Sequence, residues 1–384
     1  MIELQLTDRA EKLRIEIARF LASHPPPIIP PRAGLTAFVD ISREWQRRLA
    51  AERFVGVHFP HEFGGRGYSI LEEAVIQEEL ARQRSPQLVG LFGLTMVGPV
   101  LLKHGSDEQK RAYLSRILSA EDLWCQGFSE PEAGSDLASL RTTAELQQGK
   151  WSVSGQKVWT SFAQYARYCF MLVRTDPQAA RHRGLTYMLV DMSTPGITIR
   201  PLKQITGEEE FNELFLDSVS VPEEQVVGKP GDGWEIAIST LMFERVVLTF
   251  ARHLQSEQAL SEIADLLRER SAGEKEQEIF GRLIARSMAV RALALSHLVN
   301  YSEKPPGPEG SLDKLSWSET FQEICRFALQ LLGPRAGILS GSSAHLGGEF
   351  AHRYLYSRGR TIAAGTSEIQ RSIIAERILG LPRK

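Results

Sequence analysis

Three short segments of this 384-residue chain gather side chains that could bind a polar ligand. Residues 124–136, WCQGFSEPEAGSD, combine hydroxyl groups with a Glu-Pro pair and a tight Gly-Ser turn. Residues 155–161, GQKVWTS, add an indole beside two further hydroxyls, and residues 361–371, TIAAGTSEIQR, lead into an amphipathic helix. Turns of this composition expose backbone N–H groups and hydroxyls. The segments therefore predict a ligand site held by strand ends and a helix start.

The periodicity of apolar residues predicts the elements that position these segments. Helical spacing is expected over 7–21, with Thr7 or Asp8 as the N-cap, and over 38–52, 70–82, 99–104 and 108–118. Short runs separated by turn residues predict strands at 150–154, 168–173, 185–190, 197–200 and 213–217. Helical spacing returns over 234–270, 274–301, 312–332 and 367–379.

This order of elements predicts an α+β protein of three domains. The boundaries fall near residues 122 and 228, where the periodicity changes. We expect an N-terminal helical domain over 1–122, a β-barrel domain over 123–228 and a four-helix bundle over 229–384. A chain of 384 residues is long enough to bury a sizeable core in such domains.

The three segments, in this order and spacing, resemble the acyl-CoA dehydrogenase family of flavoproteins. The resemblance runs from the Gly64-Gly65 loop to the C-terminus and is strongest in 124–161 and 356–382. It implies the same three domains, with FAD between barrel and bundle and an acyl-CoA thioester beside the flavin. The family is commonly tetrameric with FAD at a subunit interface, so we expect a homotetramer or a heterotetramer with a related subunit.

The resemblance also assigns roles to individual residues. Ser129 and Ser161 are expected to hydrogen-bond the isoalloxazine ring and Trp159 to pack against it, while Ser135 matches a residue near the acyl thioester. The expected FAD-binding residues are Gln126, Phe128, Ser129, Gly134, Ser135, Trp159, Thr160, Ser161, Gln330, Gly333, Thr366 and Glu368. The expected substrate-binding residues are Ser135, Arg245 and Gly365.

The catalytic base is where this chain departs from much of the family. Dehydrogenation removes a proton from Cα and a hydride from Cβ, which goes to flavin N5, so a carboxylate must reach the Cα proton. In much of the family that Glu immediately precedes the Gly-Thr pair, but here the position is Ala364. A subset of the family carries the base on a bundle helix, directly before an arginine, where this chain has Glu244 before Arg245. Apolar neighbours on that helix would raise the pKa of Glu244.

Two FAD contacts of the family are altered or missing. Gln330 and Gly333 match a Gln-x-x-Gly-Gly run that reaches a neighbouring subunit's FAD, but Pro334 replaces the second glycine. An Arg-x-x-Phe-Gly element has no counterpart, because Phe280-Gly281 lies in a helical pattern without that arginine. Dinucleotide binding is expected to be weaker here or to depend on a partner chain.

Composition narrows the classes of partner and compartment. A formal net charge of −2 gives no basic field to attract nucleic acid or anionic lipid. The three cysteines lie far apart, and the histidines show no metal-ligand spacing, so we expect no disulfide and no metal. No signal pattern or membrane-length apolar run is seen, which predicts a cytoplasmic protein.

Three functions stay open at this point. The first is an FAD-dependent acyl-CoA dehydrogenase with Glu244 as base and an electron-transfer flavoprotein as electron acceptor. The second is a non-catalytic or half-site subunit of a mixed oligomer, for which the altered FAD contacts argue. The third is an acyl-CoA oxidase or flavin monooxygenase on the same scaffold, which differs in whether O₂ reaches the reduced flavin.

Overall fold

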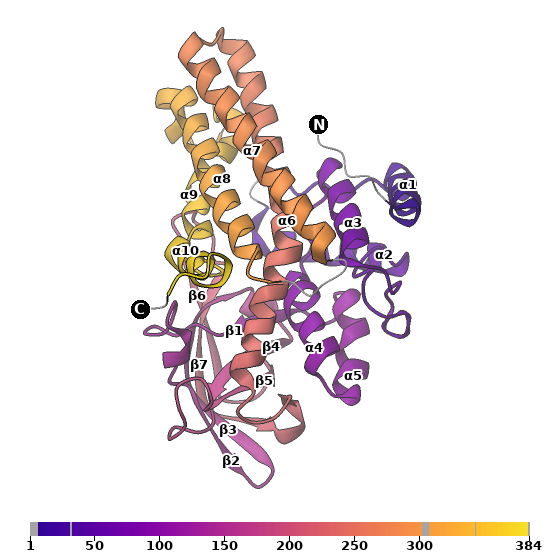
Figure 1. Ribbon diagram of the computed structural model, residues 1–384, viewed down its shortest axis with the longest axis vertical. Coiled ribbons are helices and arrows are strands. Elements are labelled where there is room, and N and C mark those ends of the chain that lie inside the picture. The colour runs from indigo at the N-terminus through magenta and orange to yellow at the C-terminus, as the bar shows by residue number, and fades with distance from the viewer. Residues whose placement is uncertain (1–6, 31–32, 302–306, 342, 383–384) are drawn as a thin grey trace. The chain divides into compact units, whose positions relative to one another are not determined.

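The chain forms two compact units that alternate along the sequence. The computed structural model describes residues 7–30, 33–301, 307–341 and 343–382, with the backbone alone for 244–251. The sheet unit consists of Pro27–Tyr68 and Pro86–Glu244, and the helical unit of the described parts of Met1–Pro26, Ser69–Ser85 and Arg245–Lys384 (Figure 1). Helix α6, Gly233–Arg270, begins in the sheet unit and ends in the helical unit.

The described residues of the sheet unit form one mixed eight-stranded sheet. Its strand order is β6-β7-β3-β2-β4-β5-β8, and β1 pairs in parallel with β4. The strands are β1 (Trp124–Gly127), β2 (Thr143–Gln147), β3 (Lys150–Ser161), β4 (Tyr168–Arg174), β5 (Leu185–Asp191), β6 (Ile197–Leu202), β7 (Phe211–Pro222) and β8 (Val226–Val227). The unit also contains helices α2 (Gly34–Ala51), α4 (Gly98–His104) and α5 (Asp107–Leu118).

One hydrophobic cluster lies inside this sheet. It takes Leu214 and Val219 from β7 at one end of the strand order, and Met188 from β5 and Val226 from β8 at the other. Since side chains from both ends pack in one cluster, the sheet curls around its core. Buried residues alternate along the first parts of β3 and β7, as expected when one face is covered, whereas β4 and β5 are buried on both faces.

Strand β3 lies very close to Thr142 at Gly155. The register with β7 shifts between Val153 and Gly155 and again between Lys157 and Thr160. At Gly155, where φ is +151°, an added Cβ would lie 2.7 Å from the Cα of Thr142. Only glycine fits so close an approach. The first register shift adds a residue to β7 and the second adds one to β3, so the side-chain alternation of β3 changes between Lys157 and Thr160.

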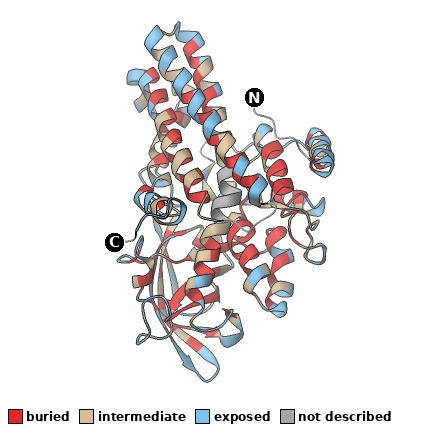
Figure 2. Ribbon diagram, viewed as in Figure 1, coloured by how far each residue is buried: buried red, intermediate tan, exposed pale blue. Residues whose placement is uncertain are grey.

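Helix α8 (Gly310–Leu332) lies at the centre of the helical unit. Helix α8 supplies many of the buried side chains of the unit's main cluster, among them Trp317, Phe321 and Ala328 (Figure 2). The Trp317 indole nitrogen donates to the backbone oxygen of Arg252, 2.7 Å away. The other helices of the unit are α1 (Asp8–Ser23), α3 (Ile70–Arg82), α7 (Glu274–Tyr301), α9 (Glu349–Arg360) and α10 (Ser367–Ile373).

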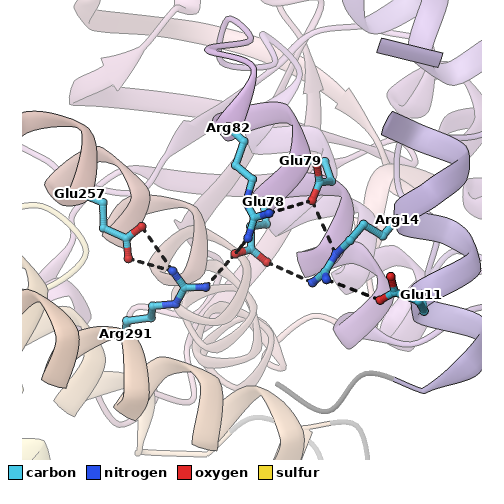
Figure 3. Close-up of polar contacts among 7 residues, drawn as sticks. All are labelled: Glu11, Arg14, Glu78, Glu79, Arg82, Glu257 and Arg291. Atoms are coloured by element: carbon cyan, nitrogen blue, oxygen red, sulfur yellow. Dashed lines mark hydrogen bonds and ion pairs between the residues drawn. The ribbon is translucent and has the colours of Figure 1, made fainter. Parts of the chain in front are cut away.

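Helices α1 and α3 are joined to α6 and α7 by a group of ion pairs (Figure 3). We call it the charge network; its members are Glu11, Arg14, Glu78, Glu79, Arg82, Glu257 and Arg291. Glu78 is its central acid, 2.9 Å from a nitrogen of Arg82 and 2.9 Å from one of Arg291. The hydrophobic contact of α3 with α7, through Leu71, Ala74, Ala294, Leu295 and Leu298, accompanies these pairs.

The predicted fold class is confirmed, with helices first, a central β domain and helices again. Several elements have the expected bounds, and Thr7 caps α1 by accepting a hydrogen bond from the N–H of Ala10 at 3.2 Å. Helix α9 was not predicted, because Phe350 and Ala351 are almost its only apolar buried residues. The helix predicted over 367–379 is α10 followed by a π-helical turn, Ile374–Ile378. The domain boundaries at 122 and 228 stay a prediction. Among the described helices, none is both long and apolar enough to cross a bilayer.

Candidate active site

The first predicted segment leaves β1 and forms a tight turn. The backbone groups of Glu130 and Ala133 exchange two hydrogen bonds, at 2.9 and 3.1 Å, across Pro131. Phe128 is buried, with its ring edge-on to those of Phe170 and Tyr187. Beyond the turn the chain reaches the surface: Gly134 and Ser135 are exposed, whereas Gln126 and Ser129 are half-buried.

An ion pair holds this turn from inside. The ammonium group of Lys157, which is fully buried, lies 2.8 Å from the Glu130 carboxylate. That carboxylate also accepts hydrogen bonds from the backbone N–H groups of Arg141 and Thr142 and from the Thr142 hydroxyl. Burial raises the pKa of Glu130, but Lys157 and these donors outweigh it, so the pKa is lowered. Glu130 is therefore a structural anion and a poor base.

The second segment places an indole on the surface. Trp159 is 60% exposed, and its backbone has a φ of +60°, a left-handed conformation that non-glycine residues seldom adopt. It lies within the register shift between β3 and β7, where a bulge redirects a side chain. Its ring meets Phe211 edge-on, with the centroids 5.9 Å apart. An exposed indole supported by a second ring can form the wall of a site for a flat ligand.

Thr160 and Ser161 follow Trp159 at the end of β3. Thr160 is buried, its backbone oxygen accepts from the Asn212 amide at 3.1 Å, and its hydroxyl has no hydrogen-bond partner among the described residues. Ser161 is half-buried and pairs with Phe211. The two residues before Trp159 join the first two segments: the Val158 N–H donates to the Ser129 oxygen at 2.9 Å, and the Lys157 ammonium donates to the Phe128 oxygen at 3.2 Å.

The third segment is a turn in the helical unit. Ala364 and Gly365 have φ values of +57° and +91°. Lys314 of α8 donates to the Gly365 oxygen at 2.6 Å, and the Gln370 amide donates to the oxygens of Ala364 and Gly365. Thr366 is the N-cap of α10 and accepts from the Ile369 N–H at 3.2 Å. These hydrogen bonds fix the conformation of the turn. The side chain at position 364 is only a methyl group, because the residue is Ala364.

Glu368 is the first acid after this turn. It is exposed, and its own backbone N–H and the Thr366 hydroxyl lower the pKa of its carboxyl group. A carboxylate stabilised in this way at a helix start is a weak base. Residues 361–368 therefore hold no acid suited to remove a proton from carbon.

The predicted pair Gln330 and Gly333 lies away from this turn. Both are exposed at the C-terminal end of α8, where Gly333 has a φ of +54°. Lys314, which contacts the turn, is 16 residues earlier on the same helix, about 24 Å away at 1.5 Å per residue. Within one chain Gln330 and Gly333 therefore lie far from Gly365, while Gln322, midway along α8, donates to the Thr361 hydroxyl at 3.0 Å. Gly281 lies inside α7, as the sequence predicted for the missing Arg-x-x-Phe-Gly element.

The predicted base and its neighbour lie on helix α6. Glu244 and Arg245 have helical backbones, but their side chains are outside the described residues. Their roles stay predictions.

The described residues fit a flavin in their chemistry. Among the described residues, unpaired buried polar atoms occur at the second and third predicted segments. They are the Thr160 hydroxyl in the sheet unit, and the Ser367 hydroxyl and Gln370 oxygen in the helical unit. Hydrogen bonding is thus incomplete where a ligand with donors and acceptors is expected. The exposed Trp159 and half-buried Ser129 and Ser161 provide an aromatic wall and hydroxyls of the kind that bind an isoalloxazine ring.

Fold and site together define a flavin-binding oxidoreductase of helical, β and helical domains. The chain matches the family models described as "Acyl-CoA dehydrogenase, N-terminal domain" over residues 7–121, "Acyl-CoA dehydrogenase, middle domain" over 125–219 and "Acyl-CoA dehydrogenase, C-terminal domain" over 231–379. It is 41% identical to acyl-CoA dehydrogenase IpdE1 of Mycobacterium tuberculosis over 344 residues, which cover 89% of this chain and 88% of that protein.

Solved structures agree with this match. The ChsE4-ChsE5 complex from Mycobacterium tuberculosis superimposes with a TM-score of 0.86 at 29% identity, over 100% of both chains. The structure titled "Tcur3481-Tcur3483 steroid ACAD" gives a TM-score of 0.87 at 26% identity, again over 100% of both chains. The chain therefore belongs to the acyl-CoA dehydrogenase family. It is an acyl-CoA dehydrogenase, and its cofactor is FAD.

Sequence reasoning missed four residues that shape the site. Lys157 and Glu130 hold the first two segments, and Lys314 and Gln370 hold the third. Lys157 lies within the second predicted segment, where nothing in the sequence marked it as buried. The sequence offered no sign of which acid would face it.

Proposed function

We propose that this chain catalyses α,β-dehydrogenation of an acyl-CoA thioester with Glu244 as the catalytic base. The observation that carries the proposal is the 361–368 turn, in which Ala364 stands at the family's usual base position and Glu368 is an exposed acid of lowered pKa in the first turn of α10. The proton must then go to a carboxylate elsewhere. Glu244 before Arg245 on α6 matches the alternative position of the family's subset.

Each protein group has a distinct part in the reaction. Glu244 takes the Cα proton, and burial on an apolar helix would bring its pKa toward the working range. Donors near the thioester oxygen stabilise the enolate-like charge, a role that we assign to the region of Ser135 and Gly365. Trp159 orients the flavin face, and Ser129 and Ser161 hydrogen-bond its edge. Bound FAD would supply the acceptor for the Cβ hydride, with an electron-transfer flavoprotein as the electron acceptor.

The base assignment is tested by Glu244→Gln. We expect the rate of flavin reduction by substrate to fall by roughly 10²–10⁴-fold, the usual contribution of a general base, with FAD still bound. Glu235→Gln is the matched control, because Glu235 is an exposed acid in the first turn of the same helix. Stopped-flow absorbance at the flavin band under anaerobic conditions measures the rate. Normal reduction by Glu244→Gln together with a slow Ala364→Glu variant would show that the base is another residue.

We propose a bulky, polycyclic acyl group as substrate. The support is the structure titled as a steroid acyl-CoA dehydrogenase, at 26% identity over all of both chains. Anaerobic bleaching of the flavin against straight-chain, branched and steroid side-chain thioesters decides the point. Faster bleaching by a straight-chain thioester than by the steroid one would reject this substrate class.

We further propose that a related subunit completes the enzyme. Pro334 follows Gly333 at the C-terminal end of α8, and Gly281 lies inside α7 without the family's arginine, so two inter-subunit FAD contacts are altered. The solved complex ChsE4-ChsE5 is named as a pair of chains. In one form of this arrangement the present chain supplies only half of the active site. A yellow, substrate-reducible homotetramer from this chain alone would exclude the need for a related subunit. A colourless protein that turns yellow when its partner is added would support the mixed oligomer.

A further inference from the structure

The ammonium group of Lys157 has all of its donors satisfied. It lies 2.8 Å from the Glu130 carboxylate, 3.2 Å from the Phe128 oxygen and 2.7 Å from the Leu172 oxygen. Three donors thus meet three acceptors, which is the full capacity of a lysine. The side chain is fully buried on β3, and strand β4, which β2 separates from β3 in the strand order, supplies one of the acceptors. The group is fixed in direction as well as in place.

Three consecutive residues of the first segment are tied to two consecutive residues of β3. Lys157 bonds the backbone oxygen of Phe128 and the carboxylate of Glu130, and the Val158 N–H bonds the oxygen of Ser129 between them. Thr142 donates to the same carboxylate oxygen as Lys157, and the Arg141 N–H donates to the other oxygen. The backbone of Ser129 is therefore clamped on both sides by contacts that begin at Lys157.

Trp159 follows the same anchor by two residues. The register of β3 with β7 is lost between Lys157 and Thr160, so the ladder to β7 does not fix Trp159 in the usual way. The nearest fixed point before it is the Lys157 side chain and the Val158 N–H. One ion pair thus sets the positions of two residues from separate segments.

We propose that the Lys157–Glu130 pair is a positioning device that holds Ser129 and Trp159 in a fixed relation around the flavin ring. The inference rests on the proposed flavin site at these two segments. Neither charged group touches the ring; each acts through the backbone that it holds. A buried ion pair stabilises a fold less than apolar side chains of the same volume would, so its value here lies in directed hydrogen bonds at defined angles.

The test compares three full-length variants. The double variant Lys157→Met with Glu130→Gln removes both charges, so neither is left buried without a partner. Thr142→Val is a milder change that removes one donor to Glu130, at 2.5 Å. Asp122→Asn is the matched control, since Asp122 is a buried acid of the sheet unit whose side chain pairs with Arg116.

Two kinds of readout separate positioning from general stability. We expect the double variant to bind FAD at least roughly tenfold more weakly, with a shifted flavin absorption spectrum and midpoint potential, and Thr142→Val to change in the same direction by less. Hydrogen exchange followed by mass spectrometry should speed up at 126–135 and 155–162 in both. Asp122→Asn, compared at equal loss of thermal stability, should change none of these.

The result that overturns the proposal is a folded double variant with unchanged exchange in both segments. Unchanged FAD affinity and spectrum beside faster exchange would also overturn it, because the segments would then move without effect on the flavin. If the wild-type chain binds no FAD, alone or with a partner, the proposed function fails. In that case the exchange comparison still tests whether the pair holds the two segments.

Discussion

In the sheet unit one buried lysine faces one buried glutamate, whereas in the helical unit four carboxylates share three guanidinium groups (Figure 3). Backbone groups and one hydroxyl complete the hydrogen bonding of Lys157 and Glu130, and both side chains are at least nine-tenths buried. The arginines of the charge network are more open, with Arg82 47% and Arg14 29% exposed. The pair therefore has no substitute partner, and the network has several.

This difference indicates different roles. An isolated buried pair fixes one geometry, because each group has a single charged partner and directed bonds. A network tolerates the loss of one member, since Glu78 can still meet Arg82 or Arg14 when Arg291 is absent. We infer that the pair serves the placement of site segments, and that the network serves the attachment of α1 and α3 to α6 and α7.

The largest expected effect is that of Lys157→Met alone. It leaves the Glu130 carboxylate buried without its cation, which costs about 3–5 kcal/mol of unfolding free energy. Adding Glu130→Gln should recover more than half of that loss. Urea unfolding followed by circular dichroism measures both. A loss of less than about 1 kcal/mol in the single variant would show that the buried carboxylate finds another partner.

A smaller loss is expected for Arg291→Met in the charge network. Glu78 loses a partner at 2.9 Å but retains Arg82 at the same distance, so about 1–3 kcal/mol is expected for a buried acid left partly satisfied. Arg268→Met, in an exposed pair on α6, is the control and should change stability by under about 0.5 kcal/mol. A loss as large as that of Lys157→Met would show that the network is no more tolerant than the pair.

The sequence predicted the helices and strands better than the contacts of the buried charged residues. The strand from 168 and the helices at 70–82 and 274–301 follow directly from apolar period, and their bounds agree with the structure to within a residue. Strand β2 was missed because a single buried residue, Ala144, gives no period to detect. Helix α9 was missed because its arginines and tyrosines obscure the two buried apolar positions.

The parts of the candidate site that depend on neighbouring residues in the sequence could be predicted. Thr366 as the N-cap and the strand-end hydroxyls follow from residue type and position. The Lys157–Glu130 and Lys314–Gly365 contacts join residues 27 and 51 positions apart, and only the fold sets such distances. The absence of a base at Ala364 was visible in the sequence, whereas the hydrogen bonds that lower the pKa of Glu368 required the geometry.

The smallest expected effect concerns the pH dependence of Glu79. Burial raises the pKa of Glu79, only partly offset by Arg82 and Arg14, whereas the pKa of Glu130 is lowered. The folded state thus binds a proton on Glu79 more readily than the unfolded state does. The cost of its charge is present at neutral pH and disappears as the pH falls through its raised pKa. Glu130 has the opposite sign, because its stabilisation is complete above the ordinary glutamate pKa and is lost as the pH falls through its lowered value.

Glu79→Gln separates these two signs. One carboxylate oxygen of Glu79 is buried without a hydrogen-bond partner among the described residues, and its ion pairs are long, at 3.5 and 3.6 Å. Removing the charge should therefore change the free energy of unfolding at pH 7 by only about 0–1 kcal/mol. The stability of the Glu79→Gln variant relative to the wild type should increase as the pH rises from about 4 to 7. The stability of the Glu130→Gln variant relative to the wild type should decrease over the same rise in pH. Urea unfolding of the three proteins at several pH values measures both trends, and parallel curves for the two variants would mean that Glu79 is as well paired as Glu130.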